Sequence, residues 1–183
     1  MIVLGIDPGT ATTGYGVVRG DARTPSLIEC GVIRTSAGTP LASRLAEIHD
    51  GVAELIARHR PDALAVELAF HSKNVRTTLV LGHARGVILL AGAHARLAIH
   101  EFSPATIKKA VVGVGGATKE QVQFMTTKLL RLKSAPSPAD AADGVAAALT
   151  CLLGRREDEK TGRRVTTVAP ETGRFPSRFA KRP

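Results

Sequence analysis

The chain has 183 residues and a formal net charge of +9 at pH 7, so it is long enough for one domain with a buried core. No signal peptide and no apolar run of membrane-spanning length is visible, and the two cysteines fit no metal-ligand spacing. These features exclude a disulfide scaffold and favour a soluble, cytoplasmic protein without a membrane partner. The basic charge favours a polyanionic partner, although a soluble surface can be basic for other reasons.

The basic charge is unevenly distributed along the chain. Residues 155–183 contain nine Lys or Arg and four Asp or Glu, a net charge of +5, which leaves +4 for residues 1–154. The end of the chain also has few aliphatic residues and no periodicity. We therefore expect one domain over 1–154 and a basic, disordered tail over 155–183. The tail could contact phosphates or be a solvated terminus.

The first third of the chain predicts three strands, a helix and a fourth strand. Apolar runs at 2–7, 14–19 and 27–34 are separated by short turns containing Pro or Gly, which is typical of an antiparallel meander. Apolar residues then recur with helical spacing over 41–56, and a buried-looking strand follows at 63–67.

The second half of the chain predicts a long helix over 74–96, a strand over 98–102 and three further helices. Antiparallel strands followed by alternating helices and strands indicate an α/β fold. We expect a mixed five-stranded sheet with helices on both faces. Such sheets bind ligands beyond the ends of their strands.

Three sequence signals mark where the last helices begin. Ser103-Pro104 is typical of an N-cap followed by proline in the first turn, and Thr118 with Gln121 forms a capping-box pattern. Ser137-Pro138 predicts the start of the final helix in the same way, and we expect that helix to end near residue 154.

Four acidic residues lie at the ends of predicted core elements: Asp7, Glu67, Asp140 and Asp143. No Lys or Arg is adjacent to any of them in sequence, and a buried carboxylate is unfavourable without a partner. Asp7 and Glu67 meet at one sheet edge if their strands are parallel neighbours, and Asp140 and Asp143 share a helix face. The four carboxylates therefore predict a site for two divalent cations suited to phosphoryl chemistry.

Each acid also has a simpler interpretation. Asp140 is in a first helical turn, where a negative charge favours the helix dipole, and Asp7 precedes a Pro-Gly turn. The combination of four acids from three elements favours the metal site.

Several motifs, in order along residues 1 to about 154, resemble the RuvC family of bacterial Holliday junction resolvases. They are IDPGT at 6–10, TGYGV at 13–17, VELAF at 66–70, KN at 73–74, LGHARG at 81–86, KKAVVG at 108–113, KEQVQ at 119–123 and ADAAD at 139–143. The resemblance implies a ribonuclease H-like fold and a homodimer. It also implies endonuclease activity on four-way DNA junctions in recombination and repair, with the branch-migration proteins RuvA and RuvB as partners.

The resemblance assigns roles to individual residues. Asp7, Glu67, Asp140 and Asp143 match the catalytic acids, which would hold two Mg²⁺ per subunit, with Mn²⁺ as an alternative. Asp7 would bridge the two ions, and the products would be a 5′ phosphate and a 3′ hydroxyl.

The DNA-binding residues implied by the resemblance are Phe70, Lys73, Lys108 and Lys119. The lysines would contact phosphates near the cut, and Phe70 would stack on a base at the distorted junction. Without the resemblance, the lysines fit a solvated surface and Phe70 fits a hydrophobic core equally well.

Gly82 and Gly86 lie four residues apart on the predicted helix over 74–96, which permits close approach of another helix. The resemblance assigns that helix to the dimer contact. Packing against the chain's own sheet is the alternative.

Three other functions share parts of this pattern. Another ribonuclease H-like nuclease would need the same acids, and an ATP-binding protein of the actin and hexokinase type has a similar Asp-Pro-Gly-Thr hairpin but needs a second lobe. A module that binds junctions without cutting them would have no need for four carboxylates that repel phosphate.

Overall fold

The computed structural model describes residues 1–68 and 75–161, with side chains through residue 154. Its centre is a five-stranded sheet in the order β3-β2-β1-β4-β5. The strands β1, β2 and β3 are antiparallel, whereas β4 and β5 run parallel to β1. The expected mixed sheet is therefore confirmed; its strands are β1 Ile2–Asp7, β2 Thr12–Arg19, β3 Ser26–Arg34, β4 Ala63–Glu67 and β5 Ala98–Phe102.

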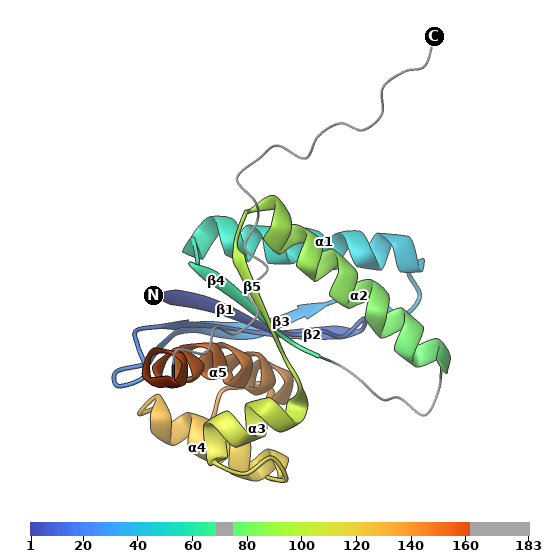
Figure 1. Ribbon diagram of the computed structural model, residues 1–183. Helices are drawn as coiled ribbons and strands as arrows, with labels where there is room; N and C mark the ends of the chain where they lie inside the picture. Colours follow the sequence, from blue (N-terminus) through green and yellow to red (C-terminus); the bar gives the residue numbers. More distant parts are fainter. Residues whose placement is uncertain (69–74, 162–183) are drawn as a thin grey trace.

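Helices cover both faces of the sheet (Figure 1). On one face α1 and α2 enclose a core built on Leu4, Ile6 and Leu64. On the other face α5 lies against the sheet, with α3 and α4 packed beside it around Val145 and Leu149. The helices are α1 Leu41–His59, α2 Val75–His94, α3 Pro104–Val112, α4 Lys119–Leu129 and α5 Ala139–Thr161. Within the described residues, no helix combines the length and hydropathy needed to cross a membrane.

Two of the predicted helix starts are confirmed. The Ser103 hydroxyl accepts a hydrogen bond from the Thr106 backbone N–H at 3.1 Å, and Pro104 is the first residue of α3. At α4, Thr118 and Gln121 form both hydrogen bonds of a capping box. These caps satisfy N–H groups that have no partner inside the helix.

The prediction for α5 was wrong at both ends. The helix begins at Ala139, so Pro138 lies just before it instead of in its first turn. It continues to Thr161 instead of ending near residue 154. Residues 155–161 consist mostly of Arg, Glu and Lys, which are good helix formers, and none of them is a proline that would stop the helix.

The backbone of α5 lies directly against the backbones of β1 and β2, and glycines make this contact possible. A Cβ added at Gly5 would lie 2.1 Å from the Gly144 carbonyl oxygen, and one at Gly14 would lie 1.9 Å from the Asp140 carbonyl oxygen. A Cβ added at Gly144 would lie 2.6 Å from the Tyr15 Cα. These separations are far below van der Waals contact, so a side chain at any of these positions would force α5 away from the sheet.

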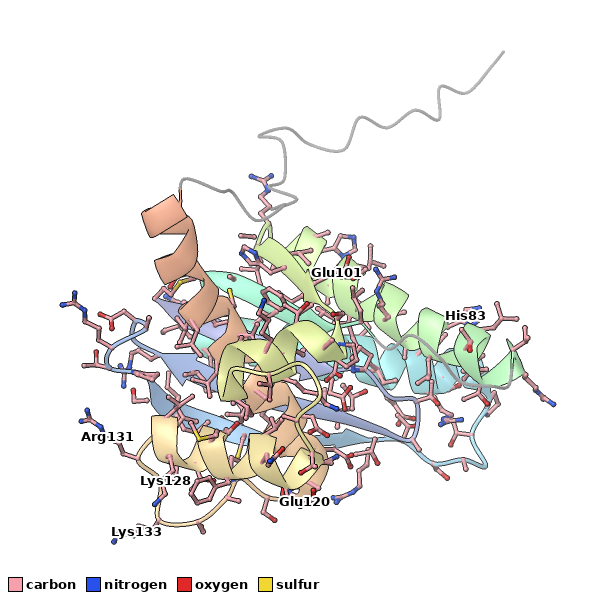
Figure 2. The ribbon with its side chains drawn as sticks, turned by 60° about the horizontal axis from the view of Figure 1, so that its bottom comes forward. His83, Glu101, Glu120, Lys128, Arg131 and Lys133 are labelled. Atoms are coloured by element: carbon pink, nitrogen blue, oxygen red, sulfur yellow. The ribbon has the colours of Figure 1, made fainter. Side chains whose placement is uncertain are left out.

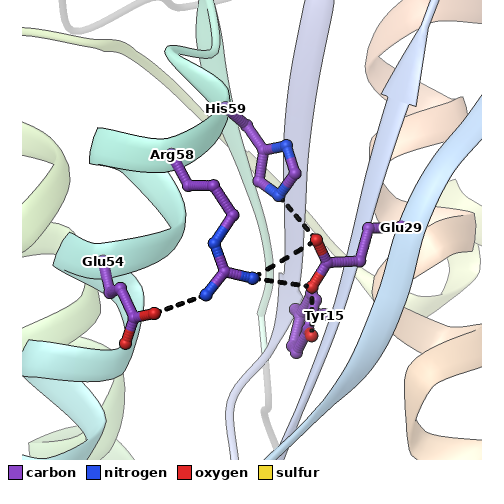
Figure 3. Close-up of polar contacts among 5 residues, drawn as sticks. All are labelled: Tyr15, Glu29, Glu54, Arg58 and His59. Carbon is purple, nitrogen blue, oxygen red and sulfur yellow. Dashed lines mark hydrogen bonds and ion pairs between the residues drawn. The ribbon is translucent and has the colours of Figure 1, made fainter.

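A polar cluster on the other face of the sheet ties β2 and β3 to the end of α1 (Figure 3). The Tyr15 hydroxyl donates to Glu29 at 2.8 Å, His59 Nε2 lies 2.8 Å from Glu29, and Arg58 bridges Glu29 to Glu54. Burial, together with this hydrogen bond to Glu29, raises the pKa of Tyr15 to about 12. The same hydrogen bond holds the pKa of Glu29 below its usual value. The cluster therefore fixes the outer strands, away from the acids at the ends of β1 and β4.

The glycine contact predicts the effect of adding one methyl group. Gly14→Ala would place a Cβ against the α5 backbone and should lower the free energy of unfolding by about 1–3 kcal/mol, measured by urea denaturation. Gly154→Ala, on α5 itself, is the control, because no atom of the described residues outside the backbone of α5 lies within 4 Å of the added Cβ. The control should be neutral or slightly stabilising. Equal stabilities for the two variants would contradict the close contact.

Candidate functional site

Asp7 and Glu67 lie at neighbouring strand ends, as expected. The parallel pairing of β1 with β4 places Ile6 opposite Val66, so the carboxylate that follows each of these residues emerges at the same edge of the sheet. The condition on which this meeting of the two carboxylates depended, that β1 and β4 are parallel neighbours, is therefore met.

Asp140 and Asp143 reach the same edge from the first turns of α5. In the sheet, Asp7 pairs with Gly14, and it is Gly14 that contacts the Asp140 backbone. The glycine contact thus brings the start of α5 to the end of β1. Asp7, Asp140 and Asp143 each offer a carboxylate oxygen, and these oxygens all lie within 4.8 Å of one another.

Glu67 lies beside this triad and completes the acidic site. It faces the same open cleft of about 240 Å³ as Asp7 and Asp143. The residues that line this cleft come from β1, β4, α3, α4 and α5: Asp7, Glu67, Pro104, Ile107, Lys108, Lys119, Val122, Asp143 and Ala146.

Burial and the neighbouring carboxylates together raise the pKa values of two of the acids. Burial, followed by the charges of Asp143 and Asp140, raises the pKa of Asp7 to about 7. Burial, followed by the charges of Asp7 and Asp143, raises the pKa of Glu67 to about 8. Both values lie well above those of free carboxyl groups, so a bound cation would remove an unfavourable interaction that the fold contains.

Two lysines face the acids across the cleft. Lys119, the first residue of α4, donates from its Nζ to Asp143 Oδ2 at 2.6 Å, and this hydrogen bond raises the pKa of Lys119. Lys108 on α3 lines the same cleft, and the charges of Lys119 and then Lys108 lower the pKa of Glu67, which offsets part of its rise. Sequence reasoning placed both lysines near the acids by resemblance, but it did not predict the ion pair between Lys119 and Asp143.

Phe70 and Lys73, the other two predicted DNA-binding residues, lie outside the described residues. Their roles stay predictions.

The donors present suit a hard divalent cation. Each ligand of the triad is a carboxylate oxygen, which is what Mg²⁺, Mn²⁺ and Ca²⁺ prefer. No His or Cys is among the described residues that line the cleft, so the softer donors typical of zinc sites are missing there. The site therefore fits the predicted class of metal.

Comparisons with known protein sequences identify a family. The family model described as crossover junction endodeoxyribonuclease RuvC matches residues 3–151. A protein of that name from Pelotomaculum thermopropionicum is 47% identical over 149 residues, covering 81% of this chain and 91% of its own. The corresponding protein from Moorella thermoacetica is 47% identical over 168 residues, covering 89% of this chain and 100% of its own.

Solved structures agree with the sequence matches. A RuvC structure from Thermus thermophilus superimposes with a TM-score of 0.80 at 37% identity, covering 86% of this chain and 96% of that one. The T. thermophilus protein in complex with a Holliday junction substrate gives a TM-score of 0.81 at the same identity and coverage. The yeast mitochondrial resolvase Ydc2, at 14% identity and a TM-score of 0.63, shares the fold.

The raised pKa values of Asp7 and Glu67 predict how the metal-free stability depends on pH. The folded protein keeps protons that the unfolded chain releases above pH 4, so stability should fall as pH rises from about 4 to about 8. Asp7→Asn removes part of this effect. In EDTA at pH 8 the variant should be more stable than the unmodified protein by about 1–3 kcal/mol, and the difference should shrink at pH 5.

Urea denaturation at the two pH values measures this difference. Asp50→Asn is the control, because the Asp50 side chain is 80% exposed and lies outside the cleft. If Asp7→Asn destabilised the protein at both pH values, Asp7 would instead be a structural turn residue.

Proposed function

Because the chain belongs to the RuvC family of crossover junction endodeoxyribonucleases, we propose that Asp7, Glu67, Asp140 and Asp143 are its catalytic acids. The enzyme has a ribonuclease H-like fold and resolves Holliday junctions. We infer that it does so by paired symmetric nicks that leave 5′ phosphate and 3′ hydroxyl ends. One observation supports the site assignment most strongly. The carboxylate oxygens of Asp7, Asp140 and Asp143 lie within 4.8 Å of one another at the end of β1, and Glu67 lines the same cleft as Asp7 and Asp143.

The proposed cofactor is Mg²⁺, two ions per subunit, with Mn²⁺ as a functional substitute. Asp7, Asp140 and Asp143 would hold the ions, and Glu67 would contribute from the neighbouring strand end. When bound, the ions supply an attacking water of lowered pKa and positive charge at the leaving 3′ oxygen. The protein's own part is to hold four deprotonated carboxylates at fixed positions.

We propose that lysines around the cleft bind the DNA backbone. Lys108 and Lys119 line the cleft and are suited to the phosphate at the cut. Phe70 and Lys73, which follow Glu67 closely in sequence, are proposed to contact the junction centre by stacking and by charge. Residues 1–154 have a net charge of only +4, and two divalent ions would roughly double it. Bound metal should therefore strengthen DNA binding at the site as well as enable cleavage.

The ATP-binding alternative has no support. The family match covers residues 3–151 with a nuclease family, and the acids at the start of α5 would have no role in gripping nucleotide phosphates. The same match disfavours a module that binds junctions without cutting them, because the matched family consists of endodeoxyribonucleases.

We also propose that the active form is a homodimer joined through α2. Five residues form one exposed stripe along this helix: Val75, Leu79, Gly82, Gly86 and Leu90. The three apolar side chains are 74%, 61% and 46% exposed. Within the described residues, no atom outside the helix's own backbone lies within 4 Å of a Cβ added at either glycine. This argues against the alternative that the glycines serve packing within the chain.

A two-fold dimer would suit a junction with two equivalent strands to cut. RuvA and RuvB remain proposed partners, as does a cytoplasmic location with access to chromosomal DNA. The basic tail remains a proposed source of sequence-independent phosphate contacts.

The catalytic assignment predicts that Asp7→Asn separates binding from cleavage. The substitution removes a ligand charge but changes little in shape, so it should lower the rate of junction cleavage in Mg²⁺ by at least about 100-fold. Affinity for the junction, measured by fluorescence anisotropy in EDTA, should be retained. Cleavage at the normal rate would contradict the assignment, and failure of the unmodified protein to cut would favour a binding module. A linear duplex and an RNA–DNA hybrid test junction selectivity in parallel.

The dimer proposal predicts that bulk on the α2 stripe separates the subunits. Gly82→Leu fills open space in the single chain, so it should leave the fold intact while weakening dimerisation by at least about tenfold in sedimentation velocity. Gly154→Leu, an equal change on α5, should leave the dimer unaffected. An unmodified protein that is monomeric at micromolar concentration, or an unaffected Gly82→Leu dimer, would contradict the proposal.

A further inference from the structure

Lys119 occupies an unusual position for a charged residue of α4. Glu120 and Lys128 on the same helix are exposed and project away from the body of the protein, as do Arg131 and Lys133 just after it (Figure 2). Lys119 instead directs its ammonium into the cleft, where it contacts Asp143. The Lys119 side chain therefore points into the cleft because of its contact with the acidic site.

Helix stability does not explain a lysine at this position. Lys119 is the first residue of α4, next to the positive end of the helix dipole, where a positive charge is unfavourable. The capping box of Thr118 and Gln121 already fixes the start of the helix without it. An interaction that favours this lysine must therefore come from outside the helix, and the acids across the cleft provide it.

The ammonium lies where a positive charge is most needed in the metal-free protein. Its Nζ is 2.6 Å from Asp143 Oδ2, and its charge is also favoured by Asp140 and Asp7. Asp143 is therefore both a proposed metal ligand and the hydrogen-bond partner of a lysine. The Lys119 side chain is 50% exposed, whereas that of Asp143 is 22% exposed, so the lysine has room to move and the aspartate has little.

We propose that Lys119 is a displaceable internal counterion that competes with metal for Asp143. An ammonium and a divalent ion on the same carboxylate would repel each other strongly at a separation of a few ångströms. Metal binding would therefore release Lys119 from Asp143 and leave its charge available for the DNA phosphate. This inference rests on the metal site described under Proposed function.

Lys108 provides a matched comparison for this role. It lines the same cleft from α3 and carries the same charge, but among the described ion pairs none joins it to an acid. A general effect of positive charge on metal affinity should be similar for the two lysines. Direct competition for Asp143 should be specific to Lys119.

Metal affinity measured without DNA tests the proposal. Isothermal titration of Mn²⁺ into the full chain should give a dissociation constant that Lys119→Gln lowers about 5- to 10-fold and Lys108→Gln changes less than about twofold. A second readout is the side-chain NMR spectrum of protein labelled with ¹⁵N-lysine. The Lys119 signal, assigned by its loss in Lys119→Gln, should shift as Mg²⁺ is added.

The possible failures are distinguishable. Suppose that the unmodified protein binds Mn²⁺ but Lys119→Gln binds it with equal or lower affinity. The counterion role is then wrong while the metal site stands, and the same holds if Lys119→Gln and Lys108→Gln raise the affinity for Mn²⁺ equally. A Lys119 signal that does not respond to bound Mg²⁺ also overturns it. If the unmodified protein takes up no Mn²⁺ at millimolar concentration, the metal site itself is wrong.

Discussion

The direct contact between the backbone of α5 and the backbones of β1 and β2 is the constraint on which the site depends. Asp7 belongs to a strand at the centre of the sheet, and Asp140 and Asp143 belong to a helix more than 130 residues later. Their carboxylates can meet within 4.8 Å only because Gly5, Gly14 and Gly144 let the helix lie on the sheet without intervening side chains. Packing through ordinary side chains would keep the two elements several ångströms further apart.

This close packing brings acidic side chains together, and the repulsion between them favours the binding of a cation. Burial and mutual repulsion raise the pKa values of Asp7 and Glu67, so the metal-free fold carries an unfavourable interaction at this cleft. Lys119 relieves part of it. A divalent ion would relieve more, and part of its affinity would come from repulsion already present in the fold. Electrostatic strain of this kind is typical of functional sites, where the arrangement that activity requires lowers the stability of the fold.

Local sequence patterns predicted much of the fold. Alternation, turns and caps identified the five strands and the starts of α3 and α4, because these signals act over a few neighbouring residues. The four acids were predicted from their places at element ends and from the resemblance. The structure brings Asp7, Glu67 and Asp143 to one cleft, and a carboxylate oxygen of Asp140 lies within 4.8 Å of those of Asp7 and Asp143. Helix propensity beyond Gly154 was underestimated, so the end of α5 was misplaced.

Contacts between distant segments were harder to predict. The ion pair of Lys119 with Asp143 joins α4 to α5 and leaves no mark in local sequence. The glycines that let α5 pack closely on the sheet were also not predicted. Two patterns in the sequence indicate them: small residues four apart on α5, Gly144 and Ala148, and alternating glycines in β2, Gly14 and Gly16. The spacing of Gly82 and Gly86 is a similar signal, but both glycines face open space among the described residues.

The most direct test of the central claim is a crystal structure of the protein grown with Mn²⁺, in which anomalous scattering locates the ions. Two peaks ligated by Asp7, Glu67, Asp140 and Asp143, with the Lys119 ammonium withdrawn from Asp143, would be the predicted result. Absence of anomalous density between these carboxylates at saturating Mn²⁺, or ions bound elsewhere while Lys119 still contacts Asp143, would contradict the claim that α5 and β1 together build a metal centre.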